Sequence, residues 1–368
     1  MEIDTTTVDT PALLLDIDQM EKNILDIIEF SKTYNVAYRP HIKTHKSINI
    51  AKKQIEFGAV GVTVAKVGEA EVMVHGGIKD VLIAYPIATA KKLVRVKKLM
   101  EHASITIAVD SIEQATILRE LFKDHHQTLD VWIKVNSGLN RCGVEPTAEV
   151  VELAKYLEQS PSLSLTGIFT HAGHSYAATE EEQMNTIANE EAEAVLKSVA
   201  LCEEVGIQIK HRSIGSTPTF KQAGKVDGIT EIRPGNAVFY DMVQVGLNVA
   251  NQDQCALTVL SSVVSVKENR LVIDAGSKTL ALDQGAHGNQ SIVGHGFIKE
   301  HPNLTIVRLS EEHGVIPIKG KSNVQINDRM QIIPNHACTV VNLFNTYMLH
   351  RDGKIVEQWT IDARGRID

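Results

Sequence analysis

The sequence lacks the features of membrane, secreted and nucleic-acid-binding proteins. Its 368 residues contain no apolar run long enough to span a bilayer and no long basic run, and the net charge is −8. A membrane-spanning helix needs about 20 mostly apolar residues, and nucleic-acid binding relies on clustered lysine and arginine. The N-terminal segment has neither a basic stretch nor a long apolar core, which argues against a secretory signal. We therefore expect a cytoplasmic protein with no membrane or nucleic-acid partner.

Cysteine is scarce and scattered. The four cysteines are Cys142, Cys202, Cys255 and Cys338, and no two of them form a CxxC pair. A disulfide framework is not expected, and reduced thiols fit this pattern better. The sequence also shows no internal repeat and no low-complexity tract.

The first two-thirds of the chain alternates short apolar runs with longer amphipathic ones. The runs predict eight strands near residues 36, 60, 80, 105, 130, 166, 212 and 231, most of them separated by helices. The first helix is expected over 18–35, with Asp18 as its N-cap. Because the strands are apolar throughout, a parallel sheet covered on both faces is indicated. The pattern favours a (β/α)8 TIM-type barrel over 16–246, with a doubly wound open sheet as the alternative.

From residue 247 the sequence pattern changes. It predicts short strands separated by glycine, asparagine and proline. The segment "YMLHRDGKIVEQWTI" predicts a hairpin with Asp352 and Gly353 at its turn. The segment "CTVVNLF" is also read as a strand. We predict a mostly β C-terminal domain over 247–368, joined by the N-terminal segment 1–15.

The stretch "YRPHIKTHKS" follows the first barrel strand and places Lys43 where barrel chemistry collects. Partial desolvation and the cationic neighbours Arg39, His45 and Lys46 favour the neutral, nucleophilic amine, which forms Schiff bases with carbonyls. A solvated basic loop is the alternative reading.

Glycine-rich and hydroxyl-bearing turns follow the later strands. They are "KVNSGLNRCGV", which carries Arg141, "HRSIGSTPT" with Ser216 and Thr217, and "EIRPGNAVFYD" with Gly235 and Asn236. Small and hydroxyl residues after the last two barrel strands are typical of a phosphate site.

In this order, "RPHIKTHK", "KVNSGLNRCG", "HAGHSY", "GSTPT" and "RPGNAVFYD" resemble the fold-type III pyridoxal-phosphate enzymes. Within that class the chain is most similar to the D-threonine aldolase and D-serine dehydratase group, and more distantly to alanine racemase. The resemblance covers nearly the whole chain.

The resemblance implies roles for individual residues. Lys43 would hold the cofactor covalently, with Lys46 as a competitor one helical turn into the next segment. Arg141 would contact the phenolic oxygen of the cofactor, and Arg233 its pyridine nitrogen. Further members of the site are His171 and Tyr176 beside the ring or the substrate, and Ser216, Thr217, Gly235 and Asn236 at the phosphate.

A second site is suggested by "PNHACTVVNLF". On a strand, His336 and Cys338 would share a face, so nitrogen and sulfur could converge on one ion, with Zn²⁺ as the best match. A buried histidine beside a buried thiol is the alternative. The resemblance implies a divalent metal here, with Mn²⁺ or Mg²⁺ as further options, and His-x-Cys is closer to the D-serine dehydratases than to the aldolases.

Together these features predict a metal-dependent pyridoxal-phosphate lyase acting on β-hydroxy-D-amino acids. D-serine dehydration to pyruvate and ammonia is the leading activity, D-threonine aldol cleavage the alternative, and racemisation the third. Lys43 is the expected base for dehydration, and His171, His174 or a metal-bound hydroxide for aldol cleavage. A homodimer is implied by the resemblance alone. A non-catalytic carrier and a metal-only hydrolase are the readings outside this class.

Overall fold

A computed structural model of the chain describes residues 4–283, 285, 292–319 and 322–368. The chain folds into two compact units. The barrel unit comprises Asp26–Lys43, Ile48–Gly235 and Arg366–Asp368, and the β unit comprises Met1–Leu25, Thr44–Ser47 and Asn236–Gly365. The limits of these units differ from the predicted domain boundary between residues 246 and 247. That boundary stays a prediction.

The barrel unit is built on one parallel sheet. Its strands are β2 (Ala37–Tyr38), β3 (Val62–Val64), β4 (Asp80–Ile83), β5 (Ser104–Val109), β6 (Leu129–Lys134), β7 (Leu163–Phe169), β8 (His211–Ile214) and β9 (Glu231–Ile232). They lie in the order β2-β9-β8-β7-β6-β5-β4-β3, and a parallel bridge between His41 and Thr63 joins the two ends. The predicted eight strands and barrel class are confirmed.

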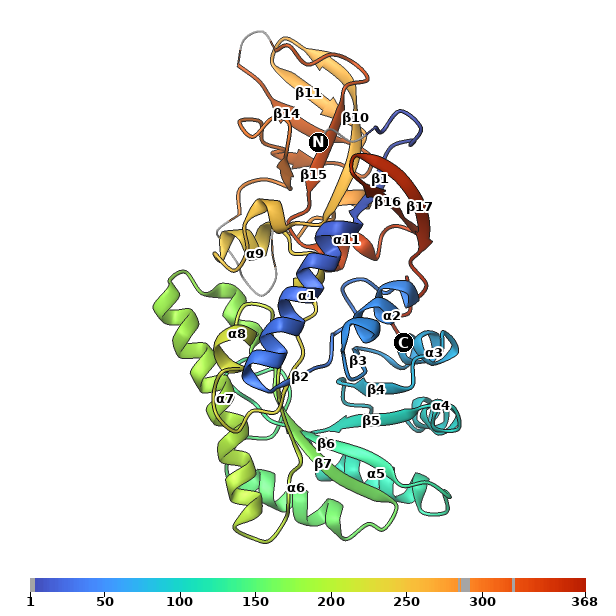
Figure 1. The fold of residues 1–368 in the computed structure, drawn as a ribbon, viewed down its shortest axis with the longest axis vertical. Coiled ribbons are helices and arrows are strands. Elements are labelled where there is room, and N and C mark those ends of the chain that lie inside the picture. The colour runs from blue at the N-terminus through green and yellow to red at the C-terminus, as the bar shows by residue number, and fades with distance from the viewer. Residues whose placement is uncertain (1–3, 284, 286–291, 320–321) are drawn as a thin grey trace. The chain divides into compact units, whose positions relative to one another are not determined.

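Helices cover the outer face of this sheet, as the ring of coils around β4 to β7 in Figure 1 shows. They are α2 (Ile48–Phe57), α3 (Val67–His75), α4 (Ala90–Met100), α5 (Ile112–Phe122), α6 (Ala148–Glu158), α7 (Glu181–Glu203) and α8 (Phe220–Ala223). Inside the sheet, Leu82, Ala108, Trp132 and Phe169 form a buried cluster. Gly167 is needed beside it, because a Cβ there would lie 2.7 Å from the Trp132 ring.

Helix α1 (Ile17–Tyr34) begins earlier than predicted. The Asp16 carboxylate accepts a hydrogen bond from the Gln19 N–H at 3.0 Å, so Asp16 caps the helix and Asp18 lies in its first turn. Two aspartates two residues apart are both good N-caps, and the sequence pattern does not distinguish them. Among the helices in the described ranges, none combines the length and the apolar character that crossing a bilayer requires.

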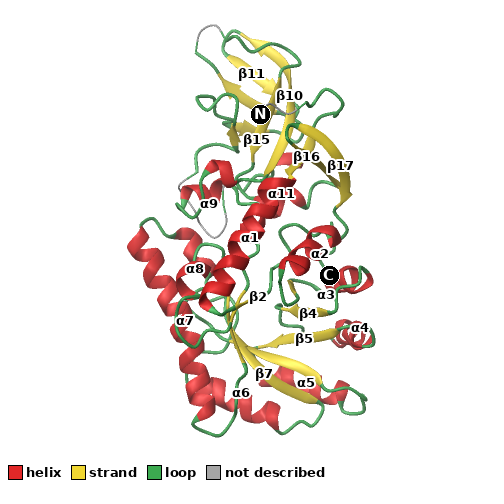
Figure 2. Cartoon of the chain, in the orientation of Figure 1, coloured by secondary structure: helices red, strands yellow, loops and turns green. Residues whose placement is uncertain are grey.

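The β unit is mostly strand and loop, as Figure 2 shows. Its strands are β1 (Ala12–Asp16), β10 (Leu257–Lys267), β11 (Arg270–Ile273), β12 (Phe297–Ile298), β13 (Arg308–Leu309), β14 (Gly314–Pro317), β15 (Arg329–Ile333), β16 (Thr346–Arg351) and β17 (Lys354–Thr360). Its short helices are α9 (Met242–Gly246), α10 (Ser277–Leu280) and α11 (Ala337–Val341). Strand β1 pairs with β10 and β16, so the N-terminal segment lies inside the sheet.

Two turns of the β unit bear on the predictions. β16 and β17 form the expected antiparallel hairpin, and Asp352 and Gly353 both have positive φ, as a type I′ turn requires. The segment at 337–341 is helical, so the predicted strand there is wrong. Its β-branched residues favour a strand only weakly, and the buried Asp241 carboxylate accepts the Ala337 N–H at 2.8 Å.

Candidate functional site

The carboxyl ends of the barrel strands carry the residues predicted for the cofactor. Lys43 follows β2, Arg141 follows β6, His171 follows β7, Ser216 follows β8 and Arg233 directly follows β9. Since parallel strands end at the same edge of the sheet, these side chains come from one end of the barrel. This is the end at which barrel enzymes place their active sites.

The electrostatic surroundings of His41 show how close the cationic side chains lie. Burial lowers the pKa of His41 well below its ordinary value, and the charges of Lys43, Arg233 and Lys134 lower it further. The Lys43 N–H also donates to His41 Nδ1 at 3.4 Å. His41 is therefore a neutral imidazole beside a group of cations.

His171 is a second neutral imidazole at this end. Burial lowers its pKa well below the ordinary value, and the charges of Lys43 and Arg141 lower it further. Its Nδ1 donates to the Gly215 carbonyl, which places the lone pair of the neutral ring on Nε2. Nε2 is thus the acceptor atom of this ring.

Lys134 is a member of this group that the sequence reasoning missed. It ends strand β6, is 5% exposed, and burial lowers the pKa of its amine while a hydrogen bond to Cys142 opposes that shift. The charges of Arg141 and Arg233 reach it as well, whereas Arg141 itself is exposed. Its position at the last residue of a strand, in the segment that leads to Arg141, was the available signal.

The turn after β8 is buried and well ordered by hydrogen bonds. Ser216 and Thr217 are 3% and 2% exposed. The Ser216 carbonyl accepts the N–H groups of Thr219 and Phe220, and its hydroxyl lies 3.0 Å from that of Ser175. Ser175 belongs to the short helix η1 (Gly173–Ala177), which also carries the half-buried Tyr176.

Arg233 is held by two neighbouring strand ends. Its Nη1 donates to the Ser213 hydroxyl at 2.7 Å, and its Nη2 donates to the Thr170 carbonyl. Burial lowers the pKa of Arg233 to about 10, against the opposing charges of Glu231 and Glu191. Even so lowered, the guanidinium stays charged at neutral pH.

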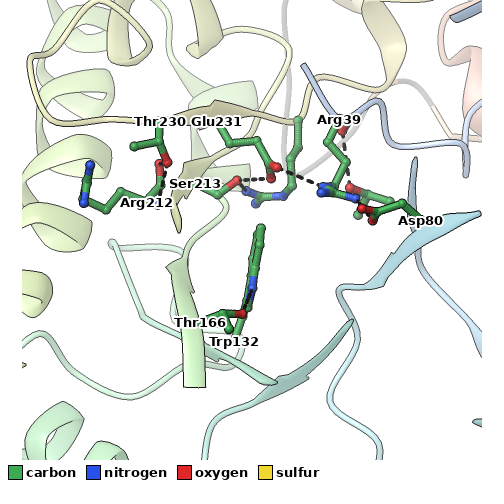
Figure 3. A network of polar contacts seen from close by, with 10 residues as sticks. Arg39, Asp80, Trp132, Thr166, Arg212, Ser213, Thr230 and Glu231 are labelled. Atoms are coloured by element: carbon green, nitrogen blue, oxygen red, sulfur yellow. Dashed lines mark hydrogen bonds and ion pairs between the residues drawn. The ribbon is translucent and has the colours of Figure 1, made fainter. Parts of the chain in front are cut away.

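Figure 3 shows the polar network that contains Arg39, Glu231 and Ser213. The Arg39 Nε donates to Glu231 at 2.9 Å and its Nη1 donates to Asp80, while the Ser213 hydroxyl donates to the other Glu231 oxygen at 2.7 Å. Burial works against the charge of Arg39, but Glu231 and Asp80 outweigh it and raise the pKa of the guanidinium. These groups fix Ser213, and through it the side chain of Arg233.

Two further predicted residues, Asn236 and Lys46, belong to the β unit. The amide of Asn236, which belongs to the β unit, donates to the buried Asp241 carboxylate at 2.5 Å. Lys46 lies in a turn with positive φ before α2 begins at Ile48, and is not one turn inside a helix. Its carbonyl accepts the Ala363 N–H at 2.9 Å.

His336 and Cys338 of the β unit do meet, but not through strand alternation. His336 is the extended N-cap residue of α11, and its imidazole hydrogen-bonds to the Cys338 thiol. His336 Nδ1 lies 2.8 Å from the Asp283 carboxylate, which the Thr339 hydroxyl also contacts at 3.1 Å. Burial acts against the charge of His336, but Cys338 and Asp283 raise its pKa well above the ordinary value.

The donor chemistry of this cluster fits a metal. An imidazole nitrogen and a thiolate sulfur suit Zn²⁺, and a carboxylate on the other imidazole nitrogen is the usual partner of a metal-binding histidine. Cys338 Sγ also lies 3.1 Å from the Thr44 hydroxyl. In residues 4–283, 285, 292–319 and 322–368, no three histidine, cysteine or acidic side chains form a metal-binding group. A metal here would thus have two protein ligands and open positions.

Comparison with known families decides where the chain belongs. The model described as "Alanine racemase, N-terminal domain" matches residues 15–242, well over half of the chain. The chain belongs to this family. The model described as "Putative serine dehydratase domain" matches residues 256–350.

The individual relatives agree with the family. The D-threo-3-hydroxyaspartate dehydratase of Delftia sp. (strain HT23) is 29% identical over 370 residues, covering 96% of this chain and 97% of that protein. The crystal structure of D-threonine aldolase from Filomicrobium marinum has a TM-score of 0.90 at 29% identity, covering 98% and 96% of the two chains. A cysteine-to-alanine mutant of D-threo-3-hydroxyaspartate dehydratase, described as the metal-free form, gives 0.89 at 28% identity, covering 96% and 97%.

The chain is therefore a fold-type III pyridoxal-phosphate enzyme of the D-threonine aldolase and D-serine dehydratase group, a lyase by class. The predicted fold and enzyme class are confirmed. The roles of the individual site residues stay predictions.

Proposed function

We propose that the protein is a pyridoxal-phosphate- and divalent-metal-dependent lyase of β-hydroxy-D-amino acids, with D-serine dehydration as its activity. The observation that carries this proposal is the group of cations at the carboxyl end of the barrel. The charges of Lys43 and Lys134 act on both neutral rings, His41 and His171. The charge of Arg233 also acts on His41, and that of Arg141 on His171. So many cations at one strand edge suit a ligand with a phosphate and a phenolate.

The residues that follow the parallel strands fit this cofactor. Lys43 would hold the aldehyde, Ser216, Thr217, Gly235 and Asn236 the phosphate, Arg141 the phenolic oxygen and Arg233 the ring nitrogen. When bound, pyridoxal phosphate supplies an electron sink that stabilises negative charge at Cα. Ser213 and Thr170 keep Arg233 in one orientation, and its positive charge would leave the ring nitrogen unprotonated.

Proton transfer is assigned to two side chains. With the cofactor bound, the Lys43 amine would take the Cα proton in the dehydratase reaction. In an aldol cleavage, His171 takes the proton of the β-hydroxyl at Nε2, because its Nδ1–H is engaged by Gly215. Tyr176, on the η1 segment after β7, would contact the ring or the substrate.

His336 and Cys338 would hold the divalent metal, with Zn²⁺ the best match to nitrogen and sulfur donors. Such an ion supplies Lewis-acid chemistry toward an oxygen such as a β-hydroxyl. The Asp283 carboxylate would orient His336 through Nδ1 and leave Nε2 to the ion. The solved metal-free form of a similar dehydratase supports a metal requirement.

D-threonine aldol cleavage is the second candidate. The chain is as similar to a D-threonine aldolase as to the D-threo-3-hydroxyaspartate dehydratase of Delftia, at 29% identity in both cases. The His-x-Cys pair and the match to a serine dehydratase domain favour dehydration.

We further propose that the protein is a cytoplasmic homodimer. Its four free cysteines fit a reducing compartment. Light scattering after gel filtration tests the dimer.

The test is incubation of the purified enzyme, with pyridoxal phosphate and Zn²⁺, with D-serine and with D-threonine. Pyruvate from D-serine supports the proposal, and glycine from D-threonine supports the second candidate. Formation of neither product, with a protein that is yellow and reducible by borohydride, would reject both and leave racemisation to be measured.

A further inference from the structure

Glu191 is a buried carboxylate that neither the cofactor nor the proton transfers above require. It lies on α7, is 0% exposed, and faces the barrel turns instead of solvent. Its Oε1 accepts the N–H groups of Ala172 at 3.2 Å and Gly215 at 3.1 Å, and its Oε2 accepts the Thr219 hydroxyl at 2.5 Å. Burial raises the pKa of this carboxyl, and the three hydrogen bonds oppose that shift.

The three donors come from three different places in the barrel unit. Ala172 lies after β7, Gly215 directly after β8, and Thr219 directly before α8. One side chain thus ties together two strand ends and the start of a helix. A residue needed only to fill space here would be apolar, because a buried carboxylate is costly without partners.

Gly215 is held from both sides. Its N–H donates to Glu191, and its carbonyl accepts from His171 Nδ1. The next residues are Ser216 and Thr217, and the Ser216 carbonyl is bound in turn by the N–H of Thr219 at 3.3 Å. Glu191 therefore fixes both ends of the five-residue turn, 215–219, that contains the residues proposed for the phosphate.

We propose that Glu191 is a positioning residue for phosphate binding, which holds the 215–219 turn in the conformation that receives the phosphate of the cofactor. This inference rests on the proposed function, since it takes the 215–219 turn as the phosphate site. It predicts that Glu191 matters for the phosphate in particular, and not for the pyridine ring or for folding in general.

The experiment compares pyridoxal phosphate with pyridoxal, which lacks the phosphate. Apo wild type, Glu191→Ala, Glu191→Gln, Thr219→Val and the exposed control Glu193→Ala are titrated with each compound, and Kd is read from the visible absorbance. Loss of hydrogen bonds to a charged group weakens binding by about 10- to 100-fold. We expect this loss in Glu191→Ala for pyridoxal phosphate, with pyridoxal affinity unchanged within about threefold on the same scale.

The other variants refine the assignment. Glu191→Gln keeps an oxygen for the two backbone N–H groups, and the Thr219 hydroxyl can rotate to accept from the amide, so we expect near wild-type affinity. Thr219→Val removes the hydrogen bond from the Thr219 hydroxyl to Glu191 and should weaken the affinity for pyridoxal phosphate by about tenfold. Glu193→Ala should change nothing.

The outcomes separate the two proposals. A wild type that binds no pyridoxal phosphate overturns the proposed function and this inference together. A wild type that binds it, beside a Glu191→Ala variant with unchanged affinity or with equal losses for both compounds, overturns this inference alone. Thermal unfolding shows whether Glu191→Ala folds. If it does not, Thr219→Val takes its place, and the ratio of its Kd for pyridoxal phosphate to its Kd for pyridoxal decides.

Discussion

The barrel unit and the β unit hold polar clusters of opposite character. In the barrel unit, cations surround the neutral rings of His41 and His171, and the carboxylates Glu191 and Glu231 lie behind the strand ends. In the β unit, the imidazole of His336 lies between a thiol and a carboxylate. The first arrangement suits an anion and the second a cation, so each region can be tested with its own ligand.

The strongest test of the barrel cluster is the substitution Lys43→Ala. We expect lyase activity to fall by at least about 10³-fold, because the covalent attachment and the base are lost together. Borohydride reduction followed by peptide mapping should label the peptide containing Lys43 in the wild type and label nothing in the variant. The exposed Lys52→Ala serves as the control. A label on Lys46, from the β unit, would break the assignment.

The proposed metal site is tested by removing one of its two proposed ligands. Cys338→Ala should bind no stoichiometric zinc and lose activity by about 10²-fold or more, since a two-ligand site cannot spare a donor. Chelation of the wild type should have the same effect and be reversed by added metal. Cys255→Ala, a buried thiol of the same unit, is the matched control. Activity indifferent to chelators would leave the β-unit cluster a structural one.

A smaller effect is expected at Asp283, whose carboxylate lies 2.8 Å from Nδ1 of the proposed ligand His336. Asp283→Asn should weaken zinc affinity by about 10- to 100-fold, because the amide orients His336 less well than the carboxylate. The measurement is competition with a chromophoric chelator, so it does not depend on turnover. The exposed Asp253→Asn should leave the affinity unchanged. An unchanged affinity in Asp283→Asn would show that this carboxylate has no part in metal binding.

The smallest effect concerns pH and the neutral histidines of the barrel unit. Because the folded pKa values of His41 and His171 lie below the ordinary 6.5, the unfolded chain binds more protons as the pH falls below that value. Their contribution to stability is therefore complete above about pH 6.5 and is lost on acidification, at about 1.4 kcal/mol per pH unit for each ring.

Urea unfolding of the wild type and of His41→Gln and His171→Gln between pH 7.5 and 5.5 measures this slope. Each variant should have a shallower dependence than the wild type, and the exposed His102→Gln should match the wild type. Equal slopes in all four proteins would mean that the two rings are not kept neutral by the fold.

Much of the barrel could be read from the chain, because each strand is a short apolar run bounded by turns. The positions of Lys43, Arg141 and Ser216 after their strands followed from the same pattern. The helix at 337–341 could not be read, since its β-branched residues favour a strand and the Asp241 carboxylate that caps its first N–H lies 96 positions away. The choice of Asp16 over Asp18 likewise depends on where β1 ends.

Local order along the chain determined the eight parallel strands, the turn at Asp352 and Gly353 and the candidate lysine, because periodicity and turn chemistry act between near neighbours. Only the tertiary structure decided that Lys134 joins the cations, that Asp283 meets His336 and that Glu191 binds the turn after β8. Glu191 and Gly215 are 24 positions apart, and Asp283 and His336 are 53 positions apart. No local sequence pattern encodes contacts over such separations.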